Sequence, residues 1–86
     1  MADESLTDEE IAQNFSAMDD SVALINATVA DDTEAKAMYG VQGAKDMVKR
    51  NTDHLELQAT KSWYSASSKS KTPYTGAVTA GKAYWS

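Results

Sequence analysis

Cysteine is absent from this 86-residue sequence, and histidine and proline occur once each. Without cysteine the chain can form no disulfide framework, no thiolate metal site and no cysteine nucleophile. The absence of cysteine does not decide between an oxidising and a reducing compartment. No apolar run is long enough to cross a bilayer or to act as a secretory signal, so we expect neither a membrane span nor a signal peptide. Length alone allows one small domain of modest stability.

The single histidine, His54, limits the catalytic chemistry that can be predicted. A general base or a zinc site at His54 needs partners from elsewhere in the chain, because neighbouring Asp53 lies on another face of a helix. The paired acids at 19–20 and 31–32 lack the spacing of a calcium-binding loop. We therefore predict no enzyme, no catalytic residue, no metal and no cofactor. A surface histidine that pairs with Arg50 or Glu56 is the simpler interpretation.

Basic residues are missing from the first 35 positions, which carry ten acidic side chains. Residues 57–86 show the opposite pattern, with four lysines and no acid, and the whole chain has a net charge of −5. An acidic front and a basic tail attract each other within one chain or between copies. Because a net negative charge repels phosphate, we expect no nucleic-acid partner, and we expect no membrane partner either.

A long helix is predicted from Leu6 to Ala30. Thr7 and Glu10 have the spacing of a capping box, and Leu6 with Ile11 that of a hydrophobic staple. Six apolar residues then recur every three or four positions, which places them along one stripe of the helix. Such a narrow stripe is typical of a surface that packs against another helix. We call these residues the apolar stripe: Ile11, Phe15, Met18, Val22, Ile25 and Val29.

A short polar turn at 31–33 predicts a second helix, antiparallel to the first, from about Glu34 to Lys61. Gly40 and Gly43 indicate a break, a kink or a close approach of another backbone, and the sequence leaves these alternatives open. Asn51 lies on the side of this helix that is expected to pack against the first helix. Either its buried amide fixes the register of the two helices, or the helix rotates so that Asn51 lies at the edge of the interface.

The composition changes after Lys61. Residues 62–72 are rich in serine and end at Pro73, which is typical of an extended linker. Residues 74–86 form either a short helix, which we favour, or an extended arm. Five of the seven aromatic residues lie in this polar tail, and aromatic side chains of this kind commonly anchor interfaces. They are Trp63, Tyr64, Tyr74, Tyr84 and Trp85.

Two runs carry a resemblance to a family. Arg50 to Leu57 (RNTDHLEL), followed by Lys61 and Trp63, resembles a run in small proteins of tailed bacteriophages, marine and cyanobacterial phages among them. The run from Ala77 to Tyr84 (AVTAGKAY) is similar to the end of the same proteins. In those proteins the segment between the two runs is acidic and helical, whereas here it is rich in serine and lysine. The resemblance implies a virion or virion-assembly protein, without an active site.

Together these observations predict an all-α protein with two parts: an antiparallel helical hairpin at residues 1–61 and a linker with an aromatic arm at 62–86. We expect the apolar stripe and the tail aromatics to bind partners, namely a larger virion component of the head, neck, tail or fibre, in several copies or as a homo-oligomer. The expected location is the virion. The alternative is a small acidic phage regulator that binds a host enzyme. A chain that ends at Lys61 is expected to keep its helicity and to lose attachment.

Overall fold

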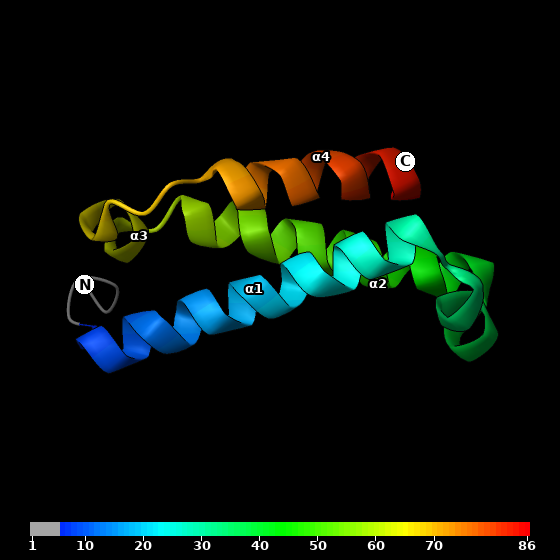
Figure 1. Cartoon of the computed structure of the whole chain (residues 1–86), viewed down its shortest axis with the longest axis horizontal. Coiled ribbons are helices and arrows are strands. Elements are labelled where there is room, and N and C mark those ends of the chain that lie inside the picture. Colours follow the sequence, from blue (N-terminus) through cyan, green and yellow to red (C-terminus); the bar gives the residue numbers. More distant parts are fainter. Residues whose placement is uncertain (1–5) are drawn as a thin grey trace.

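The computed structural model describes residues 6–86, which form four helices and no strand. Helix α1 spans Asp8–Ala30, α2 Thr33–Ala59, α3 Ser62–Ser67 and α4 Thr72–Trp85. α1 runs along the long axis of the molecule, α2 returns antiparallel to it, and α4 lies alongside them so that the C-terminus ends near the hairpin turn (Figure 1). The all-α prediction is confirmed.

The start of α1 is set by the predicted capping box. Thr7 Oγ1 accepts a hydrogen bond from the Glu10 backbone N–H, and Glu10 Oε1 accepts one from the Thr7 N–H, both at 3.1 Å. These bonds satisfy two backbone donors that a helix start leaves unpaired. Leu6 and Ile11, the predicted staple, both pack against the core. The first helix therefore begins where its sequence indicates.

Helix α2 is broken at Gly40 and continuous at Gly43. Gly40 has φ 79° and ψ 171°, a backbone conformation open almost only to glycine, and it separates a short segment at 33–39 from the long segment that follows. Gly43 stays helical, and a Cβ atom there would lie 2.7 Å from Tyr39 Cβ. Asn51 is half-buried and donates to the Met47 carbonyl oxygen at 2.8 Å, so its amide is satisfied within its own helix.

The serine-rich segment is more ordered than an extended linker. Its first half forms α3, and the chain then reverses at Ser68, which has a left-handed conformation with φ 59°. Pro73 does not end this region as a breaker. It occupies the first turn of α4, where its missing N–H would have no partner in any case. The prediction of an extended linker at 62–72 is therefore wrong for its first half.

The core lies between α1, α2 and α4, because α4 packs against both arms of the hairpin. The helix favoured for residues 74–86 is confirmed as α4, which is the third helix of a single core. Its contacts depend on Gly81, where an added Cβ would collide with Thr52 Cγ2 and lie 3.2 Å from Ile25 Cγ2. The buried apolar side chains are Met18, Ile25, Ala44, Met47, Val48, Leu55, Trp63, Tyr64, Tyr74 and Ala77.

Two glycines of α4 provide a matched test of this packing. Alanine favours a helix over glycine by about 1 kcal/mol, so Gly76→Ala, where an added Cβ meets nothing within 4 Å, should raise the free energy of unfolding. Gly81→Ala should instead lower it by about 1–2 kcal/mol, because the new methyl group separates α4 from α2. Urea unfolding followed by circular dichroism measures both changes. An equal gain in both variants would contradict the close approach at Gly81.

A candidate protein-binding groove at the hairpin end

The apolar stripe of α1 faces the core of its own chain. Met18 and Ile25 are fully buried, and Ile11, Phe15 and Val22 are half-buried against the core. None of these five therefore forms an open partner-binding face in the folded chain. A two-helix hairpin offers this stripe one interface only, which is the basis for predicting that it binds a partner, whereas in the structure α4 packs against α1 as well.

Val29 is the exception within the stripe, since 40% of its surface is exposed. Helix α2 packs on the flank of α1 that carries Ser21 and Thr28, and Ser21 Oγ lies 3.0 Å from His54 Nδ1. Thr28 consequently occupies the buried position in the last turn, although its polar side chain predicts a solvent-facing one. Two small hydroxyl residues, Ser21 and Thr28, are thus buried on the flank of α1 that faces α2.

Three tail aromatics are buried rather than displayed. Trp63, Tyr64 and Tyr74 surround Phe15, with ring centroids 5.1, 5.1 and 6.4 Å from the Phe15 ring. Each buried hydroxyl has a partner: Tyr74 donates to Asp19 Oδ1 at 2.8 Å and Tyr64 to the Ser70 carbonyl at 2.9 Å. Burial raises the pKa of both phenols. The prediction that these three anchor a partner is not supported, because this chain itself encloses them.

Tyr84 and Trp85 are half-buried and fasten the end of α4 to the hairpin. Tyr84 donates its hydroxyl to Asp32 Oδ2 at 3.0 Å, and Trp85 Nε1 donates to Thr52 Oγ1 at the same distance. Their rings contact the rest of the chain, and their polar atoms are used within it. They also contribute little open surface for a partner.

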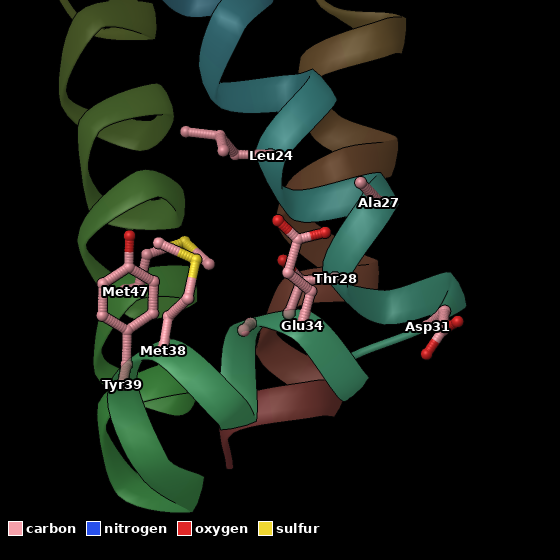
Figure 2. Close-up of a pocket in the computed structure, with 9 residues that line it drawn as sticks. Leu24, Ala27, Thr28, Asp31, Glu34, Met38, Tyr39 and Met47 are labelled. Carbon is pink, nitrogen blue, oxygen red and sulfur yellow. The ribbon is translucent and has the colours of Figure 1, made fainter.

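The largest exposed apolar side chains gather instead around the turn between α1 and α2. We call the opening there the hairpin-end groove, a hollow of about 400 Å³. Figure 2 shows Leu24 on the α1 side directed toward the side of α2 that carries Met38, Tyr39 and Met47, with the carboxylate of Glu34 to one side of them, next to Thr28. Its lining comprises Leu24, Ala27, Thr28, Asp31, Glu34, Ala35, Met38, Tyr39 and Met47.

The groove exists because the first segment of α2 is fixed at an angle to the rest. Gly40 supplies the break, and the Asp31 carboxylate accepts hydrogen bonds from Thr33 N at 3.0 Å and Thr33 Oγ1 at 2.7 Å. Asp32 occupies the N-cap position without a side-chain cap bond; it pairs with Lys36 Nζ at 3.0 Å instead. Together these contacts hold Met38 and Tyr39 away from the core.

Sequence reasoning missed this surface because it ranked residues by the regularity of their spacing. Leu24, Met38 and Tyr39 fall outside the predicted apolar stripe, and they are 49%, 64% and 51% exposed. The available signal was a pair of large apolar residues, Met38 and Tyr39, directly before Gly40. Apolar side chains next to a helix-breaking glycine cannot all follow the buried face.

Within residues 6–86, no group of three or more histidine, cysteine and carboxylate side chains is placed to hold a metal ion. His54 pairs with Ser21 across the helix interface rather than with Arg50 or Glu56. None of the described helices has both the length and the apolar character that crossing a membrane requires. Comparisons with protein-family models, with curated proteins and with solved structures found no match.

The anchor at Asp32 makes a testable prediction about pH. Hydrogen bonds from Lys36 and then Tyr84 lower the pKa of Asp32 below its ordinary 3.8. A lowered folded-state pKa stabilises the protein above pH 3.8, and this contribution disappears as the pH falls through the folded-state value. In a carbon-detected NMR titration, Lys36→Met should raise the pKa of Asp32 more than Tyr84→Phe does. Lys45→Met, which changes a lysine elsewhere on α2, should leave it unchanged. An Asp32 that titrates near 3.8 in the unaltered chain would contradict this anchor.

Proposed function

We propose that this protein is a non-enzymatic virion accessory protein of a tailed phage, which binds repeated copies of a larger head, neck, tail or fibre component. The observation that carries the proposal is the cluster of exposed apolar side chains around the hairpin-end groove. Leu24, Met38 and Tyr39 stay largely in water although the rest of the chain closes a well-packed core. An apolar cluster of this kind on a small folded protein commonly marks a binding surface.

We propose the hairpin end as the binding surface, in place of the apolar stripe and the tail aromatics. A rigid scaffold supports such a role, since α4 fixes α1 and α2 relative to each other through contacts along its length. Tyr74 bonds to Asp19 in the middle of α1, and Tyr84 bonds to Asp32 at the turn beside the groove. A groove held in this way loses little conformational entropy when a partner enters it.

The virion setting rests on the resemblance of Arg50–Leu57 and Ala77–Tyr84 to small proteins of tailed phages. Both runs help to build the scaffold. Thr52 and Leu55 are buried in α2, and Gly81 is the point where α4 meets Thr52. The two similar runs thus face each other across the interface between α2 and α4, which supports a shared architecture more than a shared binding site.

An acidic regulator of a host enzyme is the second candidate. Among the described acids of residues 8–34, only Asp32 forms an ion pair with a lysine or arginine. Asp8, Glu9, Asp20 and Glu34 remain exposed carboxylates on α1 and the start of α2. A surface of this charge attracts basic proteins and can compete with nucleic acid for them.

The location of the protein distinguishes the two candidates. Quantitative mass spectrometry of purified particles of the encoding phage should find the chain in several copies per virion, with synthesis late in infection. A replication enzyme encoded by the same phage serves as the purity control and should be absent. Early synthesis together with absence from particles would overturn the virion role and favour the regulator.

Incorporation should depend on the groove. The double variant Leu24→Ser and Met38→Ser should reduce the copy number in particles about tenfold or more, because two anchors of the binding surface are lost. Leu57→Ser changes an equally exposed leucine on α2 that does not line the groove, and it should be incorporated normally. Normal incorporation of the double variant would place the binding surface elsewhere.

A further inference from the structure

We infer that the hairpin-end groove receives a basic amphipathic helix of the partner protein. This inference rests on the proposed binding function and adds the chemistry of the segment that is bound. The groove has two apolar sides from different helices, Leu24 and Ala27 on α1 and Met38, Tyr39 and Met47 on α2. Its α1 side extends from Leu24 to Asp31, roughly 10 Å or two helical turns. A hollow of this shape fits the apolar face of a short helix.

The charge of the groove lining indicates the sign of the charge on the bound segment. Glu34 and Asp31 are the charged residues of the groove, and no lysine or arginine lines it within the described chain. Glu34 is exposed and forms no ion pair with any described residue, so its charge is available to a partner at the groove. Asp31 lies at the outer edge, and its hydrogen bonds to Thr33 lower its pKa, so it is ionised at neutral pH. Lysine or arginine beside an apolar stripe complements this lining, and acidic residues oppose it.

The two methionines suit this kind of ligand. Met38 and Met47 have unbranched, flexible side chains with polarisable sulfur, which adapt to different apolar partners. Met47 is buried at the base of the groove, whereas Met38 is 64% exposed at its rim. The rim can therefore close over an apolar side chain that rests on the base.

A second copy of the chain fits the groove poorly. A symmetric pair would bring the Glu34 carboxylates of two copies together, and each copy has a net charge of −5. The lysine near the end of α4, Lys82, is already paired with Glu56 at 2.8 Å. A partner of opposite charge is favoured over self-association for both reasons.

The test uses the full-length chain and two synthetic peptides of about 14 residues, roughly four helical turns. The peptides share leucines at helical spacing and differ only in their polar positions, which are lysine in one and glutamate in the other. NMR spectra of the labelled protein should show that the lysine peptide shifts the signals of Leu24, Met38 and Tyr39. Its affinity should exceed that of the glutamate peptide by about tenfold at low salt, and the difference should shrink as salt is added.

Matched variants separate the apolar and the charged contributions. Met38→Ser should weaken binding of the lysine peptide about tenfold, and Leu57→Ser should not change it. Glu34→Gln should weaken it about threefold and reduce its salt dependence, whereas Glu9→Gln, which removes an exposed charge at the far end of α1, should have no effect. Since Met38, Glu34 and both control residues are exposed, all four variants should keep the fold, which circular dichroism verifies.

Three results of the peptide titrations would overturn the inference. They are equal binding of both peptides, binding of neither, and signal shifts confined to residues outside the groove. Self-association that disappears in Met38→Ser would also overturn it, because the occupant would then be a second copy. If the chain is packaged into virions but does not bind the lysine peptide, the proposed function stands and this inference is wrong. If the chain binds the peptide through the groove but is absent from particles, this inference stands and the proposed function is wrong.

Discussion

The close contact between α4 and the hairpin is the constraint on which the rest of the structure depends. At Gly81 the missing side chain lets α4 lie directly on Thr52 of α2, within reach of Ile25 of α1. Two helices of this length have a single interface and cannot enclose the aromatic side chains of the tail. The third helix converts that open pair into a core, in which Tyr64 and Tyr74 are almost completely enclosed.

This closure determines which surface is left for other molecules. Helices α1, α2 and α4 share a core along the bundle, and apolar exposure concentrates where the short segment at 33–39 departs from it at Gly40. The departure is fixed by hydrogen bonds of Asp31, Asp32 and Tyr84. The same C-terminal helix that completes the core therefore also holds the segment that forms the groove.

The sequence predicted the parts of the fold that local rules determine. The capping box at Thr7 and Glu10, the all-α class and the hairpin turn follow from side-chain chemistry within a few residues. The location of the tail could not be predicted from local rules. Its burial depends on contacts of Phe15 with Trp63, Tyr64 and Tyr74, which lie far from Phe15 in the sequence. Spacing identified the apolar stripe but could not show what covers it. The groove was missed for the opposite reason, since the break at Gly40 removes Met38 and Tyr39 from any regular pattern.

Helix α4 completes the core of the single chain. Far-UV circular dichroism of a fragment that ends at Lys61, compared with the full chain in dilute solution, tests it most directly. We expect the fragment to lose most of the helical signal of the residues it retains, the reverse of the expectation from sequence alone. A fragment that stays as helical as the same residues in the full chain would contradict the claim.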